Sequence, residues 1–472
     1  MAPYVVLLSL LGAFAAHRLA LVAIYLRRRA LAPPPPHDDD DRPVVTVQLP
    51  LYNEAAVAER LLDAAAAIDW PRDRLEIQVL DDSTDETTAL VAAKVAALRA
   101  RGVDATHLRR GERVGFKAGA LEHGLAAARG ELLAVFDADF VPGPDVLART
   151  TGCFADPAVG MVQARWGHLN RDDSLLTQAQ ALLLDGHFVL EHGARSRAGC
   201  FFNFSGTAGV WRKAAIVDAG GWQADTLTED MDLSVRAHLR GWRFAFLPDV
   251  VVPAELPADM NALKSQQFRW AKGQVQVLRK LGGAVARARL PAWKRVDALF
   301  HLTSNVSYVF LFAACLLLPW TIGARFPAPA FLGATAAMAA FYALAQREIG
   351  GGALAALARA PLVMAVCAGM SAHQSRAVLE ALCGRASPFV RTPKTGGRPP
   401  RYRAARSRAC ALELAVGAYL LAGAVAAAAA RAFSTLALLL IFAAGFVYVG
   451  ATSLGGRRHR HLDDRRRARV AG

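Results

Sequence analysis

Long apolar segments constrain this chain more than any other feature, because they decide which parts of it can fold in water. Residues 4–26 are long enough to cross a bilayer, although His17 and Arg18 interrupt the run. Further apolar stretches, rich in Ala, Leu, Gly and Phe, recur at about 298–322, 329–346, 352–373, 409–430 and 432–452. They lack the polar outer face that the helices of a buried soluble domain would need. We therefore predict a multi-span α-helical membrane domain.

The N-terminal segment has one alternative, which is a cleaved signal peptide. The chain lacks a charged start, and the apolar run is too long for that alternative. Arg27, Arg28 and Arg29 follow the run directly. By the positive-inside rule this flank is cytoplasmic, so we expect the N-terminus to face the opposite side.

The number of spans contains a conflict. The segment 376–408 holds nine Lys or Arg residues and one Glu, so we expect it to be cytoplasmic. Three full crossings between the preceding soluble domain and this segment would place it outside. We therefore predict that 352–373, which carries Arg359, lies in the interface or dips in and out. About five spans result, with every basic segment on one side.

The overall composition narrows the class of partner. The chain of 472 residues is 54% hydrophobic and carries a formal net charge of +15. Its basic residues cluster at membrane flanks, where the lipid surface already explains them, so we expect membrane lipids and no nucleic acid as partners. The six cysteines are scattered without a Cys-x-x-Cys pair. They predict neither a zinc site nor a disulfide scaffold, and they favour a reducing compartment.

Residues 44 to about 256 alternate between strand and helix patterns. The predicted strands are 44–50, 75–82, 131–139, 160–166, 243–247 and 249–252, and the helices between the first three are 54–68 and 87–102. Such alternation predicts a Rossmann-like, mostly parallel sheet covered by helices. The predicted units are an N-terminal transmembrane helix (1–30), a Pro- and Asp-rich linker (31–43), a cytoplasmic α/β domain (44–285), a membrane domain with interfacial helices (286–455) and a basic cytoplasmic tail (456–472).

Polar clusters follow three consecutive predicted strands, at 49–54, 80–85 and 136–140. Taken alone, each could be an ordinary helix cap or turn. Ligands of open α/β sheets bind at the carboxyl ends of the strands, so three clusters at one edge would line a single polar crevice.

The pair Asp137 and Asp139 points to a cation. Two carboxylates at the edge of a core repel each other and are costly to desolvate. A turn after the strand can direct both at one Mg²⁺ or Mn²⁺, which takes its other ligands from water and substrate phosphates. A diphosphate-bearing substrate is therefore indicated. The chain has no Walker loop, Gly-x-Gly-x-x-Gly or kinase-type signature, which argues against ATPase and dehydrogenase chemistry.

Two later motifs fit the same site. Glu229 and Asp230 stand at the start of a predicted helix, where helix capping is the alternative role. Gln266, Arg269 and Trp270 share one helix face, being spaced i, i+3 and i+4. An amide, a guanidinium and an indole suit a sugar, which offers hydroxyls and a C–H face. The alternative is an interfacial Trp beside a snorkelling Arg.

Together these motifs resemble a known family. Asp82 in "DDS", then "DAD", "TED" and "QQFRW", resemble the signature of processive family-2 glycosyltransferases, in particular the cellulose synthase-like group that is similar to glucomannan and xyloglucan-backbone synthases. "SPFVRTPKTG" (387–396) resembles the gating loop of cellulose synthase, with Arg391 in place of Val. The resemblance runs from about residue 42 to 396. It implies a GT-A-type nucleotide-sugar-binding domain, with a cytoplasmic gating-type loop within 376–408.

The resemblance also implies roles for individual residues. The donor-binding residues would be Tyr52, Glu54, Asp81, Asp82, Lys117 and Asp137, with Asp137 and Asp139 holding the diphosphate through the metal. From the sequence alone, Lys117 could equally be a surface lysine near a glycine turn. The catalytic motif would be Glu229 and Asp230, with Asp230 as general base, and the acceptor end and leaving diphosphate would be bound by Gln266, Arg269 and Trp270. The residues closing over the donor would be Phe389, Thr392 and Lys394.

The expected function is transfer of a hexose, with inversion, from UDP-glucose or GDP-mannose to a growing polysaccharide, coupled to its export. The same acids would serve either donor, and the acceptor could be a polysaccharide or a glycolipid. One alternative is transfer of a single sugar to a lipid. Another is a non-enzymatic transporter or scaffold, which the scarcity of intramembrane acids disfavours. We expect an integral protein of a bacterial plasma membrane, and the sequence leaves its oligomeric state open.

Overall fold

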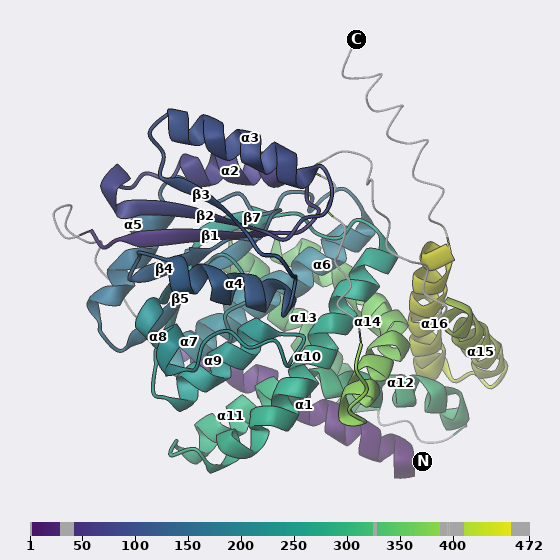
Figure 1. The fold of residues 1–472 in the computed structure, drawn as a ribbon. Coiled ribbons are helices and arrows are strands. Elements are labelled where there is room, and N and C mark those ends of the chain that lie inside the picture. The colour runs from purple at the N-terminus through teal and green to yellow at the C-terminus, as the bar shows by residue number, and fades with distance from the viewer. Residues whose placement is uncertain are drawn as a thin grey trace.

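The structure is a computed structural model, which describes residues 2–28, 42–323, 328–387, 394, 396 and 410–454. An α/β domain occupies one side of the molecule, and long helices extend from it (Figure 1). The fold thus joins a mixed, mostly parallel sheet to several apolar helices, as the strand and helix patterns predict.

The sheet has seven strands in the order β3-β2-β1-β4-β6-β5-β7. The strands are β1 (Val45–Leu51), β2 (Leu75–Asp81), β3 (Ala105–Arg109), β4 (Leu132–Val135), β5 (Val159–His168), β6 (Gly209–Arg212) and β7 (Arg243–Ala254). Every neighbouring pair is parallel except those of β6, which runs antiparallel to both β4 and β5. The expected mostly parallel sheet is therefore present, but β3 and β6 were not expected from the sequence.

The helices of the α/β domain cover both faces of the sheet. They are α2 (Ala58–Ala66), α3 (Thr87–Ala100), α4 (Phe116–Ala127), α5 (Val146–Thr150), α6 (Leu175–Asp185), α7 (Gly193–Ala198), α8 (Lys213–Asp218) and α9 (Glu229–Leu239), with a π-helix at Gly186–His192. Figure 1 shows α2 and α3 above the sheet and α4 below it. One core cluster joins α2 and α3 to the sheet, and a second joins α4, α8 and α9 to the opposite face.

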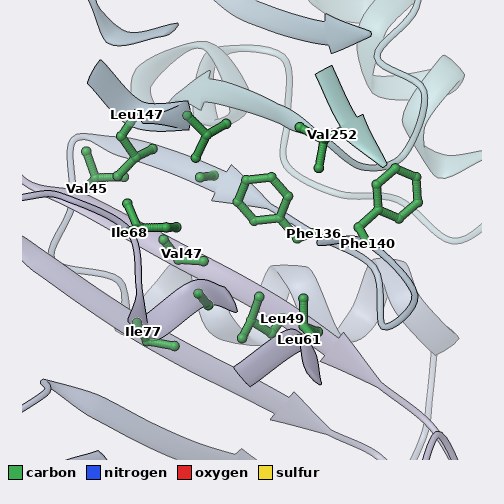
Figure 2. Close-up of a cluster of buried hydrophobic side chains, with 14 of the residues drawn as sticks. Val45, Val47, Leu49, Leu61, Ile68, Ile77, Phe136, Phe140, Leu147 and Val252 are labelled. Carbon is green, nitrogen blue, oxygen red and sulfur yellow. The ribbon is translucent and has the colours of Figure 1, made fainter. Parts of the chain in front are cut away.

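The central strands are buried on both faces, as their continuous apolar runs predict. Alternate residues of β1, among them Val45, Val47 and Leu49, are fully buried and pack with Leu61 of α2 and Ile77 of β2 (Figure 2). The paired registers of β1, β2 and β4 bring their carboxyl ends to the same edge of the sheet. This edge carries the polar clusters.

The remaining helices are α1 (Ala2–Arg27), α10 (Met260–Arg287), α11 (Ala292–Thr303), α12 (Ser307–Leu317), α13 (Ala328–Glu348), α14 (Ala353–Leu382), α15 (Cys410–Ala429) and α16 (Phe433–Leu454). Within the described ranges, five helices are long and apolar enough to cross a membrane: Ala2–Arg27, Ala292–Thr321, Ala353–Leu382, Cys410–Ala429 and Phe433–Leu454. The chain is therefore suited to membrane association.

Helix α14 can be assessed in two ways. Its length and composition would allow it to cross a bilayer. However, both of its ends contact the α/β domain or α10. Near its start, Arg359 Nε donates to Gln178 Oε1 of α6 at 3.1 Å, and near its end Glu380 pairs with Lys272 of α10 at 3.0 Å. These contacts join the first part of α14 to the α/β domain and its last part to α10.

Candidate active site

A cavity of about 210 Å³ opens at the carboxyl edge of β1, β2 and β4, and α10 forms its far wall. The residues predicted from the sequence that line it are Tyr52, Glu54, Asp82, Lys117, Asp137, Asp139, Glu229, Asp230, Gln266, Arg269, Trp270 and Lys394. Segments more than 300 residues apart in the chain, from Tyr52 to Lys394, therefore meet in one space. Phe389 and Thr392 lie outside the described residues.

The two acids of the Asp-x-Asp motif follow β4, which ends at Val135. The Asp137 side chain is 35% exposed and contacts Lys117, whose Nζ lies 2.5 Å from Asp137 Oδ1. The Asp139 side chain is only 3% exposed, and Lys394 Nζ lies 2.6 Å from its Oδ2. Each carboxylate therefore has a lysine as its cationic partner.

Lys117 is fixed at the base of the cavity by α4. Its Nζ also donates to the backbone oxygen of Gly206 at 2.8 Å. Burial lowers the pKa of this ammonium group, but the charges of Asp137 and Glu229 together outweigh burial and raise it. Lys117 is therefore a fixed positive charge directed at the acids, and not a surface lysine.

Glu229 and Asp230 begin α9 and face the same cavity. Asp230 Oδ1 accepts a hydrogen bond from the Met231 backbone N–H at 2.7 Å. Burial, reinforced by the neighbouring charge of Glu229, raises the pKa of Asp230 to about 7. A carboxyl group with this pKa can accept a proton near neutral pH, which a simple helix cap does not require.

Gly206 allows Asp230 to occupy this position. Its φ of +81° is in the left-handed region that favours glycine. A Cβ atom at residue 206 would lie 2.9 Å from Asp230 Oδ2 and 3.5 Å from Lys117 Nζ. The loop before β6 therefore approaches the acid through its backbone alone.

The opposite wall of the cavity is the helix face of Gln266, Arg269 and Trp270. Burial lowers the pKa of Arg269 to about 10, against the opposing charges of Glu229 and Asp137, so the guanidinium stays protonated at neutral pH. The ring of Trp270 lies beside that of Trp166 on β5, with 6.2 Å between the ring centroids. This wall combines a cation with aromatic surface.

Comparison with known proteins agrees with this geometry. The family "Glycosyltransferase like family 2" matches residues 42–273. Glucomannan 4-beta-mannosyltransferase 7 from Arabidopsis thaliana is 38% identical to this chain over 401 residues, covering 80% of this chain and 71% of the relative. The chain belongs to glycosyltransferase family 2.

Other relatives extend this comparison. Glucomannan 4-beta-mannosyltransferase 2 from Arabidopsis thaliana is 42% identical over 290 residues, which cover 59% of this chain and 54% of the relative. The chain thus spans about half the length of the first curated relatives that it matches. Among solved structures, mannosyltransferase PcManGT from Pyrobaculum calidifontis, in complex with GDP-Man and Mn²⁺, is 27% identical with a TM-score of 0.55, covering 80% of this chain and 100% of that one.

In this family-2 glycosyltransferase, the side of the cavity formed by Tyr52 and Asp82 is built on ring and guanidinium contacts. The Arg113 guanidinium lies over the Tyr52 ring, 3.4 Å from its centroid. Arg110 binds both carboxylate oxygens of Asp82, with Nε 3.0 Å from Oδ1. Tyr52, Asp82 and Arg113 all line the cavity. This side of the cavity therefore combines an aromatic ring with paired guanidinium and carboxylate groups.

Asp81 does not have the predicted position. It is not among the described residues that line the cavity, and it is 1% exposed. Its carboxylate instead accepts the Ser83 N–H at 2.8 Å and lies 2.9 Å from His107 Nε2. Burial raises the pKa of Asp81, but these hydrogen bonds together lower it below its ordinary value. Asp81 therefore supports the turn that carries Asp82, and direct contact with the donor is not indicated.

Several cavity residues were not expected from the sequence. They are Arg113, Trp166, His168 and Glu255, and they come from a loop and from the ends of β5 and β7. Glu255 accepts hydrogen bonds from Arg60 Nη2 at 2.8 Å and from the Gly396 backbone N–H at 3.1 Å. The Gly-rich, charged stretch around Arg113 and the aromatic end of β5 were the available signals.

The carboxylates of Asp137 and Asp139 are of the ligand type that divalent cations such as Mg²⁺ and Mn²⁺ prefer. No group of three or more His, Cys, Asp or Glu side chains suited to a metal occurs in the described part of the chain. Asp137 and Asp139 would thus be two hard oxygen ligands, and Mg²⁺ or Mn²⁺ commonly takes its other ligands from water and substrate phosphates. The lysines already paired with both acids indicate that this pair needs a positive partner.

Proposed function

We propose that this chain is a membrane-bound, inverting β-glycosyltransferase that transfers a hexose from a nucleotide sugar to a growing polysaccharide. One observation carries the proposal. A single cavity contains the Asp-x-Asp acids, a partly buried Asp230 with a pKa of about 7, and the Gln266, Arg269 and Trp270 face. Donor binding, proton transfer and acceptor binding can therefore occur together.

Asp230 is the proposed general base. It would remove the proton of the acceptor hydroxyl as that oxygen attacks the anomeric carbon and the diphosphate leaves. A single displacement of this kind turns an α-linked donor into a β-linked product. Glu229, next to it, raises the proton affinity of Asp230 through its charge. We propose this electrostatic role for Glu229.

Arg269 and Lys117 are the proposed electrostatic partners of the leaving group. Both are partly buried cations at the cavity, and they would stabilise the negative charge that develops on the diphosphate. Bound Mg²⁺ or Mn²⁺ on Asp137 and Asp139 would neutralise further charge as a Lewis acid. Lys394, which contacts Asp139, would adjoin the same phosphates as part of the gating-type loop.

The proposed donor is GDP-mannose in preference to UDP-glucose. The named relatives are glucomannan 4-beta-mannosyltransferases, and PcManGT was solved with GDP-Man and Mn²⁺. Tyr52 and Glu54, with Asp82, would bind the base and ribose of either nucleotide. Specificity for mannose is thus supported by the comparisons more than by these side chains.

We further propose five spans: α1, α11 with α12, α13, α15 and α16. Helix α13 ends beside the α/β domain, where Gln346 Nε2 donates to Asp185 Oδ2 at 2.7 Å. Helix α15 begins beside α10, where Glu413 pairs with Lys264, and α16 ends there at Ser453. With α14 in the interface, the catalytic domain, the segment 376–408 and the tail 456–472 would all be cytoplasmic. The named curated relatives are plant proteins, so a bacterial plasma membrane has no support from them.

The decisive experiment is turnover by membranes that contain the chain. Membranes would receive radiolabelled GDP-mannose or UDP-glucose with Mn²⁺, Mg²⁺ or a chelator, and Asp230→Asn membranes would be the control. We expect metal-dependent label from GDP-mannose in a polymer that a β-mannanase digests. No transfer from any nucleotide sugar would overturn the proposal. A single labelled sugar on lipid would replace polymer synthesis by the alternative reaction.

A further inference from the structure

Helix α10 has two buried lysines that the proposed reaction does not use. Lys264 and Lys272 flank the acceptor-binding residues Gln266 to Trp270, and both are at most 1% exposed. Lysine is rarely buried to this extent unless a partner compensates its charge. The partners of both residues come from the C-terminal helices.

Lys264 contacts the last two helices. Its Nζ lies 2.5 Å from Glu413 Oε2 on α15 and 2.6 Å from Ser453 Oγ on α16. The Glu413 side chain is fully buried. One turn earlier, Asn261 Nδ2 donates to the Ser453 backbone oxygen at 3.1 Å. The start of α10 is therefore joined to α15 and α16 by a desolvated ion pair and two hydrogen bonds.

Lys272 makes the equivalent contact with α14. Its Nζ lies 3.0 Å from Glu380 Oε2, and it also donates to Ser387 Oγ, which follows α14 in the chain. Lys272 itself is fully buried, and the Glu380 side chain is 14% exposed. The two ion pairs therefore hold α10 on either side of its acceptor-binding turn.

The lysines lie on the side of α10 opposite to the cavity. At about 100° per residue, Lys272 is roughly 80° around the helix from Lys264, whereas Gln266, Arg269 and Trp270 lie between roughly 140° and 240°. Gly273 lies on the cavity side, where a Cβ atom would come within 2.6 Å of the Thr228 side chain. Movement of the ion-paired face would therefore be transmitted to the residues before Glu229.

We propose that Lys264 and Lys272 are positioning residues, which hold the acceptor-binding turn of α10 at a fixed place through ion pairs with Glu413 and Glu380. The proposal rests on the proposed glycosyl transfer, since acceptor binding is the property that these two ion pairs would control. The Lys264–Glu413 pair lies at the start of a helix suited to the membrane, where removing two charges from water is costly. A role in positioning the adjacent acceptor-binding turn would offset this cost. Donor binding on the sheet edge would not depend on it.

The test compares Lys264→Met, the neutral double variant Lys264→Met/Glu413→Gln, and the exchanged pair Lys264→Glu/Glu413→Lys. Lys94→Met, which removes a surface pair with Asp63, is the matched control. Three quantities are measured in purified protein: the Kd for GDP with Mn²⁺, the kcat and acceptor KM of sugar transfer, and hydrogen exchange in peptides covering α10.

We expect Lys264→Met to raise acceptor KM or lower kcat by roughly 10- to 100-fold, since small misplacements of binding groups have effects of this size. The Kd for GDP should stay within about twofold of the wild type, and α10 should exchange faster. The exchanged pair should recover at least part of the loss. If Lys264→Met fails to fold, the neutral double variant, which leaves no unpaired charge, should show the same kinetic change.

The opposite results are equally clear. Unchanged kinetics and unchanged hydrogen exchange in a folded Lys264 variant would overturn the positioning role. A loss of GDP binding as large as the loss of sugar transfer would also overturn it, because it would indicate general destabilisation. If the wild type transferred no sugar at all, the proposed function would fail. The hydrogen exchange of α10 would then still test whether the ion pairs position this helix, and unchanged exchange would show that they do not.

Discussion

The two walls of the cavity are built in different ways. The proposed donor wall, with Tyr52, Asp82 and Asp137, stands on strand ends of a sheet whose core is complete without the long C-terminal helices. The proposed acceptor wall stands on α10, whose other face is ion-paired to α14 and α15. The difference teaches that nucleotide binding and acceptor binding should be separable by mutation, because only the acceptor wall depends on the apolar helices.

Replacing Asp230 by Asn should give the largest difference between the effect on sugar transfer and the effect on nucleotide binding. The amide cannot accept the proton, so sugar transfer should fall by roughly 10²- to 10⁴-fold, the usual contribution of a general base. Binding of GDP with Mn²⁺ should remain, because the donor wall is intact. Radiolabel transfer and nucleotide titration measure the two properties, with exposed Asp73→Asn as the control. Normal transfer by Asp230→Asn would mean that another group is the base.

Replacing Asp139 by Ala should affect the donor wall instead. Removing even an outer partner of a metal ligand typically weakens metal affinity by about 10- to 100-fold, and removing a proposed ligand should cost at least as much. Nucleotide affinity should then no longer increase with added Mn²⁺. A titration of Mn²⁺ against bound GDP checks this, and an unchanged metal response would remove Asp139 from the proposed ligand set.

The pH dependence should report on Asp230 and its neighbour. The pKa of about 7 means that the base loses its proton as pH rises through neutrality, so transfer should increase with pH and fall about tenfold per unit well below pH 7. Since the charge of Glu229 contributes to this raised pKa, Glu229→Gln should move the rising limb to lower pH. Rate profiles of both proteins test this, and an unshifted limb would argue against the coupling.

Gly273→Ala should give the smallest effect and affect the acceptor wall. Its Cβ atom would meet Thr228 Oγ1 at 2.6 Å and the Thr228 backbone nitrogen at 2.9 Å. Overpacking of this kind typically costs about 1–3 kcal/mol, so transfer should fall while nucleotide binding is kept. Gly283→Ala, at a site where the neighbour is the flexible end of Arg287, is the control. Equal losses in both variants would contradict the special contact.

Much of the site could be predicted because its residues follow secondary-structure patterns. The donor acids come directly after strands, and Gln266, Arg269 and Trp270 have helix spacing. Asp81 does not line the cavity, because neighbouring residues of an extended chain point to opposite sides. Asp82 therefore faces the cavity, whereas Asp81 faces His107.

The parts that the sequence missed depend on contacts between distant segments. Strand β6 has only four residues, and its antiparallel pairing with β4 and β5 has no local signal. Trp166 and Glu255 reach the cavity because β5 and β7 end at the same edge of the sheet. In the sequence Lys264 looks like an ordinary helix lysine. Only the structure shows its partner, Glu413, which lies 149 residues later in the chain.

The contacts of α14 affect the number of membrane crossings before α15. In the proposed topology α14 contributes no crossing, so the chain would enter α15 from the side that it occupied before α14. The turn near Arg431, between α15 and α16, would then lie on the opposite side of the membrane from the start of α15 and the end of α16. A glycosylation or protease tag inserted there should be reached from the opposite compartment to one fused after α16.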